Sequence, residues 1–365
     1  MRRREALAAG GSVLAVLSAG CLEALRRDDA WRELVVDPPE GVYVPPHADE
    51  MVRYGTATAV GREISLLASR PHSFWVVADA ERNRADVRSR HDLHLMATVR
   101  DAETGAFVPA PVTTTIRARG ADTDEPIDRR SLWPMLSQRM GAHYGDNVPL
   151  AGDGSYVATI RVGATTANAT GRRADVLERE TSVEAEFAFD TNEIEGLERR
   201  LIDEAEGRGE AGALEPMDHA VRGDVGPSRD PGAELGAATS GDIEYTATLL
   251  DDTDRSGIDA PILAVTPRTA YNSFPLPFAG LAASVARDGE RIASAPLRET
   301  LDARLGHCYG TAVDPAILER GDELTIDLET PPQVARHEGY ETAFLEERSV
   351  TFSRTNRYRG RSSAP

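Results

Sequence analysis

The sequence contains no lysine: all of its basic residues are arginine, and 60 aspartates and glutamates leave a formal net charge of −19 over 365 residues. A surface this acidic keeps a chain soluble through self-repulsion, and strong salt screens the repulsion that opposes folding. The composition is typical of a protein from a salt-loving archaeon, although GC-rich codon usage also favours arginine over lysine. It makes nucleic acid an unexpected partner, because no basic patch meets phosphate.

Cysteine is almost absent, since only Cys21 and Cys308 occur. We expect no disulfide within the chain, so stability must come from apolar cores. A hydrophobic content of 41% at this length predicts two domains of ordinary size. The sequence also lacks a Gly-x-Ser-x-Gly elbow, a phosphate-binding loop and a His-Glu-x-x-His helix, and we therefore expect it not to be an enzyme.

Long apolar runs are missing too. The apolar run near the N-terminus, Ala6–Gly20, is shorter than the roughly 20 residues that span a bilayer. Arginines precede it and small residues end it, which is the order of an export signal. Arg3 and Arg4 resemble a twin-arginine signal, and Leu17–Cys21 resembles a lipobox. We expect residues 1–21 to be a signal peptide and Cys21 to be acylated, which anchors the protein in the membrane at the extracellular face. A plain signal peptide cut elsewhere is the alternative.

The remaining sequence predicts an all-β protein. Residues 22–50 are charged and proline-rich, as in a tether. Residues 51–192 contain short alternating runs between Gly, Pro, Asp and Asn turns, which predicts an antiparallel β-sandwich. Residues 193–240 have the composition of an acidic linker, and the β pattern returns over 241–353. Residues 354–365 predict a frayed tail.

An internal repeat connects the two halves. Met140–Gly145 is followed by a Gly-Asp turn and a strand, and Leu305–Gly310 is followed by the same features. Upstream, Met96–Asp101 is matched with Ala282–Asp288. We interpret the halves as two copies of one sandwich, the second diverged; a chance likeness of two β domains is the alternative.

The densest group of chemically distinctive residues lies within 133–148, where Met135, Met140 and His143 occur. Thioether and imidazole ligands together suit Cu(I) or a borderline divalent ion such as Fe(II). Spacing alone also fits core methionines and a structural histidine, so both interpretations stay open.

Three consecutive motifs resemble the periplasmic iron-transport protein family. They are Trp-Pro-Met135, then Gly-x-His143-Tyr-Gly-x-Asn-Val, then a Gly-Asp-Gly-x-Tyr turn and strand. The resemblance covers about residues 50–190. It implies an exported, often lipid-anchored protein with an immunoglobulin-like β-sandwich fold, which binds iron or copper beside a high-affinity iron permease. Members commonly form homodimers, so a permease and a second copy are the implied partners.

The resemblance also implies a ligand set. It consists of the Met of the Pro-Met motif, the His of the His-Tyr-Gly motif, a His-x-Glu pair on an early strand, and a His from the partner subunit. Met135 and His143 match the first two, and Met140 is the alternative methionine because the spacing is one residue longer than usual. The early strand Ile64–Ala68 is apolar and offers no His-x-Glu pair, so we expect His72, or Glu63 at its other end, to compensate.

The second half offers a weaker group of ligands. The repeat puts Cys308 where the first half has His143, His307 stands beside it, and Pro331–His337 resembles the family's late histidine-bearing segment. Its first-half counterpart, near Thr165, has no His. A Cys308, His307 and His337 group suits Cu or Zn if the first two lie in a loop. A buried thiol and two surface imidazoles are the alternative.

Two further features have weaker interpretations. His91 and His94 are three apart on an expected strand, so they should face opposite sides and share no metal. Asn168-Ala169-Thr170 is a glycosylation sequon, which fits a modified or a bare surface loop equally well.

We therefore expect a lipid-anchored metal-binding accessory to Fe²⁺ uptake. A cell-surface structural or interaction lipoprotein with a degenerate metal site is the alternative, and a redox-active copper protein resting on Cys308 is a third hypothesis.

Overall fold

The computed structural model describes residues 37–120, 125–170, 173–221, 232–250, 260–314, 317–318, 321–346 and 348–353. The chain divides into two compact units, 1–39 and 40–365, and the fold described below belongs to the second. The expected signal peptide, Cys21, most of the tether and the tail after 353 lie outside the described residues. Within the described part, no helix has the length and apolar character needed to cross a membrane.

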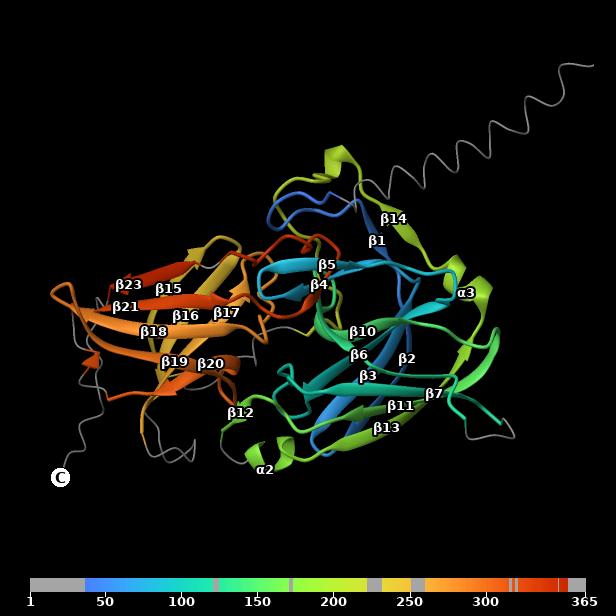
Figure 1. Ribbon diagram of the computed structural model, residues 1–365, viewed down its shortest axis with the longest axis horizontal. Coiled ribbons are helices and arrows are strands. Elements are labelled where there is room, and N and C mark those ends of the chain that lie inside the picture. The colour runs from blue at the N-terminus through green and yellow to red at the C-terminus, as the bar shows by residue number, and fades with distance from the viewer. Residues whose placement is uncertain are drawn as a thin grey trace, which may run out of the picture. The chain divides into compact units, whose positions relative to one another are not determined.

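The protein is all-β and has two β domains (Figure 1). The first contains an eight-stranded sheet of order β2-β3-β6-β10-β9-β22-β4-β5 and a four-stranded sheet of order β13-β11-β7-β8. The strands of the first sheet are β2 (Val52–Ala59), β3 (Arg62–Ser69), β6 (Leu93–Asp101), β10 (Gly141–Val148), β9 (Trp133–Ser137), β22 (Ala335–Arg336), β4 (Phe74–Ala78) and β5 (Glu81–Ala85). Those of the second are β13 (Thr181–Phe189), β11 (Gly154–Val162), β7 (Val112–Ala118) and β8 (Asp128–Ser131).

Alternation of side chains explains how these sheets form a core. On β11, Tyr156, Ala158 and Ile160 are buried, whereas the residues between them are not. Because successive side chains on a strand face opposite sides, one face of this sheet packs inward and the other meets water. The small elements around the sandwich are β1 (His47–Asp49) paired with β14 (Arg199–Leu201), β12 (Asn168–Ala169), α2 (Ala174–Leu177), α3 (Thr191–Gly196) and η2 (Glu204–Glu206).

The second domain is a nearly closed, barrel-like sheet of eight strands rather than the expected sandwich. Its order is β15-β16-β17-β20-β19-β18-β21-β23. Its strands are β15 (Ala233–Ser240), β16 (Ile243–Leu250), β17 (Ile262–Thr269), β18 (Gly280–Arg287), β19 (Glu290–Asp302), β20 (Gly306–Ala312), β21 (Glu323–Thr330) and β23 (Ser349–Ser353).

The difference between the domains comes from one strand. In the first domain, Leu132 separates β8 from β9, and each half joins a different sheet. In the second domain, β19 runs for 13 residues without a break and pairs with β18 along one part and β20 along the other. The continuous strand carries one sheet around the domain, whereas the interrupted strand leaves two separate sheets.

The internal repeat is visible in the structure. The hydroxyl of Tyr144 donates to Val108 O and accepts from Ala110 N, and that of Tyr309 donates to Leu276 O and accepts from Ala279 N. Each tyrosine therefore fixes the loop beyond the neighbouring strand in the same way. β6 pairs with β10 in the first domain, and β17 pairs with β20 in the second, so β17 is the counterpart of β6. The sequence match of Met96–Asp101 with Ala282–Asp288 is therefore wrong, because Ala282–Asp288 belongs to β18 and the turn after it.

Ordered elements extend into the segment that was expected to be a linker. Helix α3 and strand β14 lie in its first part, and β15 begins at Ala233. Between them, Ala220 and Val221 are buried, and Val221 N donates to Met140 O. Part of this segment therefore covers the first domain; residues 222–231 lie outside the described part.

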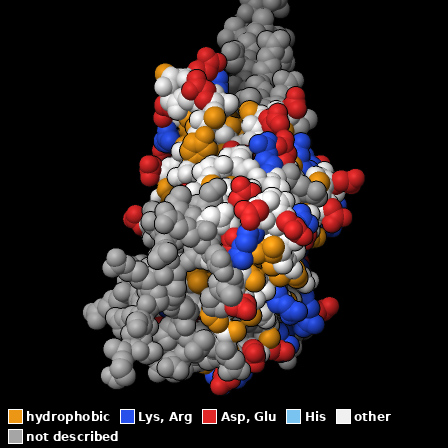
Figure 2. All heavy atoms as spheres, turned by 90° about the vertical axis from the view of Figure 1, so that its left-hand side faces the viewer, with side chains coloured by type: hydrophobic (Ala, Val, Ile, Leu, Met, Phe, Trp, Pro, Cys, Tyr) orange, Lys and Arg blue, Asp and Glu red, His pale blue; other side chains and the backbone are white. Residues whose placement is uncertain are grey.

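The described surface carries both signs of charge. Figure 2 shows acidic and basic side chains interspersed on one face. Every basic side chain among them is arginine, because the sequence has no lysine. In the first domain, Arg119 and Glu186 form an ion pair with both side chains exposed, and such exposed pairs contribute little each to stability.

Candidate metal site

The face of the eight-stranded sheet that points away from the sandwich core collects imidazole and thioether groups. On β6, Leu93 and Leu95 join the core, so His94 between them points to the other face. On β10, Tyr144 joins the core, and His143 points the other way. The register places His143 opposite Met135 of β9. Adjacent strands therefore bring these side chains together.

Two more histidines reach the same place from other parts of the chain. His72 lies in the loop before β4, and its ring centroid is 4.1 Å from that of His94 and 4.6 Å from that of His337. His337 follows β22, and its ring is 5.7 Å from that of His143. The four residues His72, His94, His143 and His337 form what we call the histidine cluster.

In three of the four histidines, Nδ1 lies within hydrogen-bonding distance of an oxygen acceptor. His94 Nδ1 lies 3.0 Å from Asn147 Oδ1, His143 Nδ1 lies 2.9 Å from Gly141 O, and His72 Nδ1 lies 3.2 Å from Arg70 O. These acceptors require a proton on Nδ1, which leaves the lone pair on Nε2. Metal-binding histidines are commonly oriented by such bonds.

The ε-nitrogens are the unusual feature of the cluster. Nε2 of all four histidines is buried and has no hydrogen-bond partner. Leaving a buried polar atom unsatisfied costs about 1–3 kcal/mol, so four together need an explanation. A ligand that accepts electron pairs from these nitrogens would supply it.

Gly145 allows the thioether to approach. A Cβ at this position would lie 2.8 Å from both His94 Nε2 and Met135 Sδ. His94 Nε2 and Met135 Sδ therefore lie within twice 2.8 Å of each other. Only glycine leaves room for both atoms, because real Cβ contacts are not this short.

Burial keeps the cluster neutral. Desolvation lowers the pKa of His143 to about 4 and lowers the pKa values of His94 and His337 well below the ordinary value of 6.5. It also lowers the pKa of His72, against a smaller opposing contribution from Arg70 O. Neutral imidazole is the form that binds metals, so at neutral pH the four rings have the protonation state that ligation requires.

Asn147 ties two of the histidines to the sheet. Besides meeting the ring of His94, its Oδ1 accepts from His72 N at 3.3 Å, and its Nδ2 donates to His72 O at 2.8 Å. This residue therefore holds the His72 loop against β10.

The chemistry of the donor set is soft and uncharged. Imidazole suits Cu, Zn, Fe and Ni, and thioether favours Cu(I). Two residues after His72, where a His-x-Glu pair would place its Glu, stands Phe74, with its ring 5.9 Å from that of His94. Among the described residues, the carboxylate of Asp49 acts electrostatically on His72, and it opposes the lowering of the His72 pKa. Within the described ranges, no group of three His, Cys, Asp or Glu side chains has the geometry of a formed metal site.

The structure places His72, Met135 and His143 in one region of the sheet face, and their role as metal ligands stays a prediction. Met140 lies instead in an apolar group with Leu67 and Met96, and Glu63 forms an ion pair with Arg100. Sequence reasoning missed His94, because His91 and His94 were judged only against each other. The informative signal was the alternation with core residues Leu93 and Leu95, which assigns His94 to the face of His143.

The expected group in the second half does not form. His307 and Cys308 are neighbours on β20 rather than in a loop, so they face opposite sides. His307 Nε2 lies 2.8 Å from Glu299 Oε1, whereas Cys308 is buried among Leu250, Ile262 and Ala264. His337 lies in the histidine cluster of the first domain. Burial raises the pKa of the Cys308 thiol, which disfavours the thiolate that binds metals.

The glycosylation sequon lies in β12, which pairs with β19 of the second domain. Asn168 is exposed, but the hydroxyl of Thr170 is buried and donates to Asp302 Oδ2 at 2.8 Å.

Comparison with known protein families gives one match in each domain. Residues 77–194 match the model of the Fe2+ transport protein family. Residues 228–353 match a domain of unknown function, DUF7350. Each of these two matches covers less than half of the chain. No curated protein matches the chain.

Solved structures of FetP and P19 are similar to part of the chain. A copper-bound glutamate-to-glutamine variant of FetP from uropathogenic Escherichia coli strain F11 is 19% identical, over 38% of this chain and 97% of that one, with a TM-score of 0.29. A copper-bound glutamate-to-glutamine variant of Campylobacter jejuni P19 is 19% identical, over 38% and 98%, with a TM-score of 0.30.

Proposed function

We propose that the first domain captures a metal ion outside the cytoplasm, as an accessory to Fe²⁺ uptake, and that it also binds copper. The ion is cargo, and His72, His94, His143 and Met135 are the residues that hold it. The observation that carries the proposal is the set of four buried ε-nitrogens without hydrogen-bond partners. Beside them lies the thioether of Met135, for which Gly145 leaves room. The match to the Fe2+ transport protein family supports the same function.

The donor set predicts an order of preference among metals. The proposed ligands are imidazoles and a thioether, all of them uncharged. Copper should therefore bind more tightly than Fe²⁺, in the order that nitrogen ligands generally follow. Iron would be bound weakly enough to be released to a permease.

The chain's own residues contribute orientation and protection from water. Asn147 and the carbonyls of Gly141 and Arg70 fix the rings so that Nε2 carries the lone pair. His143, His94 and Met135 are fully buried, so water has no direct access to them. The proposal assigns no catalytic step to the protein.

The wider context of this function is also a proposal. We infer that the first 21 residues direct export, that Cys21 carries a lipid anchor at the extracellular face, and that the acidic, lysine-free composition adapts the protein to salt. The two-sheet architecture of the first domain agrees with an immunoglobulin-like sandwich. Replacing Cys21 with Ser should release the protein into the medium or block its processing; a wild type that is already soluble and cut elsewhere contradicts the anchor.

A cell-surface structural or interaction protein is the second candidate. It is favoured by Phe74, which stands where a His-x-Glu pair would place its Glu, and by the finding that no group of three His, Cys, Asp or Glu side chains in the described part has the geometry of a formed metal site. In that case the cluster is a remnant, and the imidazoles contribute only packing.

Calorimetric titration separates the two functions. Wild-type protein, folded in high salt, is titrated with Fe²⁺ under anaerobic conditions, with Cu(II), and with Cu(I) by competition with a chelator. The first function predicts one ion per chain and its loss in His143→Gln, with no change in His91→Gln, because His91 is outside the cluster. Failure of the folded wild type to bind any of these ions would leave the second candidate.

A further inference from the structure

Each domain contributes one short strand to the sheet of the other domain, and we call these two strands, β22 and β12, the lent strands. β22, which lies in the sequence of the second domain, pairs in parallel with β9, with Ala335 opposite Met135. β12, which lies in the sequence of the first domain, pairs in parallel with β19, with Asn168 opposite Thr300.

The two exchanges occur at corresponding positions. Met135 is opposite His143 on β10, and Thr300 is opposite Cys308 on β20. The tyrosines that follow, Tyr144 and Tyr309, make matching hydrogen bonds, so His143 and Cys308 correspond. The exchange is therefore reciprocal, as between two subunits related by a twofold axis, but both partners belong to one chain.

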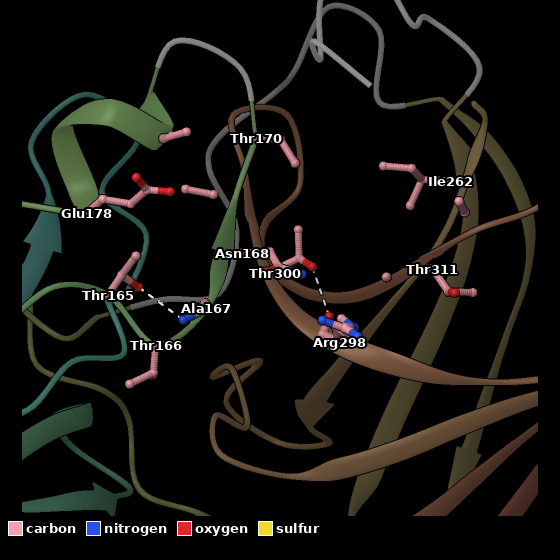
Figure 3. A pocket seen from close by; sticks show the side chains of 14 residues that line it. Thr165, Thr166, Ala167, Asn168, Thr170, Glu178, Ile262, Arg298, Thr300 and Thr311 are labelled. Atoms are coloured by element: carbon pink, nitrogen blue, oxygen red, sulfur yellow. Dashed lines mark hydrogen bonds between the residues drawn. The ribbon is translucent and has the colours of Figure 1, made fainter. Parts of the chain in front are cut away.

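The residue after each lent strand differs. His337 follows β22 and enters the histidine cluster, whereas Thr170 follows β12 and bonds to Asp302 and Leu301 O. Near Thr170, the corresponding place in the second domain is a cavity of about 690 Å³ (Figure 3). Thr165, Asn168 and Thr300 line it together with Ile262 and Arg298. It contains no imidazole among its lining residues.

The segment that delivers His337 is fixed on both sides. Before it, Gln333 Oε1 accepts from Asp79 N at 2.8 Å, and its Nε2 donates to Asp79 O at 3.0 Å. After it, Glu338 Oε2 accepts from Arg139 N at 3.1 Å. Asp79 follows β4 and Arg139 follows β9, so the segment is held across the first domain's sheet.

The segment also has its own internal support. Arg336 is fully buried and donates to Pro332 O at 2.9 Å and to Ala343 O. Gly339 has a φ of +85°, and a Cβ there would lie 2.2 Å from both Tyr43 O and Gln138 Nε2. These contacts set the loop that carries His337 in one conformation.

We propose that the second domain is a partner subunit built into the chain, which supplies His337 to the first domain's metal site so that one copy of the protein holds one complete site. This inference rests on the proposed metal-binding function. This inference gives the DUF7350 domain a role. The domain completes the metal site with His337, as a second subunit would, and has no corresponding histidine site of its own.

The central test compares His337→Gln with Thr170→Ala in the full chain. Both residues follow a lent strand, but only His337 faces the cluster. With one equivalent of Cu(II), we expect His337→Gln to lose one imidazole nitrogen from the electron paramagnetic resonance spectrum and to bind at least about 10-fold more weakly. Thr170→Ala should keep the wild-type spectrum and affinity. An unchanged spectrum and affinity in His337→Gln overturns the proposal.

A second variant loosens the segment without removing a ligand. Gln333→Ala deletes both contacts with Asp79 and should weaken metal binding to a smaller extent, with the wild-type number of nitrogens. It also provides the test if His337→Gln fails to fold. Wild-type affinity in Gln333→Ala would mean that the segment's docking does not support the site.

Oligomeric state gives an independent readout. By light scattering across a 100-fold range of protein concentration, we expect the monomer to bind one ion per chain with constant affinity. Half an ion per chain, or binding by dimers alone, would mean that a second copy completes the site. If wild type binds no metal at all, it is the proposed function that fails; if wild type binds and His337→Gln is unaffected, only the role of the second domain fails.

Discussion

His143 and Cys308 occupy corresponding positions in two domains of one chain, with different surroundings. Around His143 stand His94 and Met135; the residues at the matching register positions around Cys308 are Ile262 and Thr300. Asn147, which orients His94, corresponds to Ala312. The strands and their tyrosine contacts are shared, so the backbone framework alone does not create the site. A few side chains on one sheet face distinguish a candidate metal site from a cavity that has no imidazole among its lining residues.

The largest contrast is expected from replacing these two residues. His143→Gln should abolish the rise in melting temperature that Cu or Fe²⁺ produces, a stabilisation of about 2.7 kcal/mol at a metal concentration 100 times the Kd. Cys308→Ala should keep that rise, because its neighbours are apolar. Thermal unfolding with and without metal measures both. Equal losses in the two variants would remove the distinction between the domains.

Corresponding glycines give the next largest effect. In Gly145→Ala, the new Cβ would lie 2.8 Å from His94 Nε2 and Met135 Sδ, whereas in Gly310→Ala the nearest atom is Ile262 Cγ2 at 3.1 Å. We expect Gly145→Ala to cost about 1–3 kcal/mol of stability through overpacking and to reduce metal affinity. Gly310→Ala should cost less and leave metal binding unchanged. Denaturant unfolding and metal titration test the pair, and the reverse order would contradict the assigned geometry.

Low pH should destabilise the first domain more than the second. Burial holds the pKa of His143 at about 4, below the 6.5 of the unfolded chain, so the unfolded state takes up more protons between these pH values. Stability of the metal-free protein is therefore complete above about pH 6.5 and falls as the pH drops toward 4, by up to roughly 1.4 kcal/mol per pH unit for each such histidine.

Hydrogen exchange at pH 7 and pH 4.5 provides the measurement. Amides of β6 and β10 should lose protection before those of β17 and β20, because the cavity in the second domain is lined by no histidine. Replacement of His143 by Gln should reduce the difference. Simultaneous loss in both domains would show that the cluster does not determine acid sensitivity.

The smallest expected effect concerns the thiol. Cys308 is buried, and its raised pKa leaves little thiolate, so a thiol reagent should modify it only on unfolding. Rapid labelling of the native protein would place Cys308 at an accessible position and reopen the expectation of a second site there.

The sequence predicted the β class and two domains because alternation and turn residues report on local structure. It did not predict the barrel-like second domain, since the continuity of β19 depends on which strands pair along its whole length. The repeat was recognised from Tyr144 and Tyr309 and their glycines, which have the same structural task in both domains.

The candidate site was predictable only where its residues lie in one motif. Met135 and His143 belong to neighbouring strands and were found by resemblance. His337 was recognised as a candidate but was assigned to the wrong domain, because chain order does not reveal that β22 joins the sheet of the first domain. His94 became recognisable only from the face of the sheet to which its strand assigns it.

X-ray absorption spectroscopy of the copper-loaded full chain tests the central claim most directly, because it identifies the atoms bound to the metal. With one equivalent of Cu(I), the account predicts scattering from imidazole nitrogens and from one sulfur, and loss of the sulfur contribution in Met135→Leu but not in Met140→Leu. A spectrum without sulfur, or one that keeps its sulfur in Met135→Leu and loses it in Cys308→Ala, would contradict the placement of the site in the first domain.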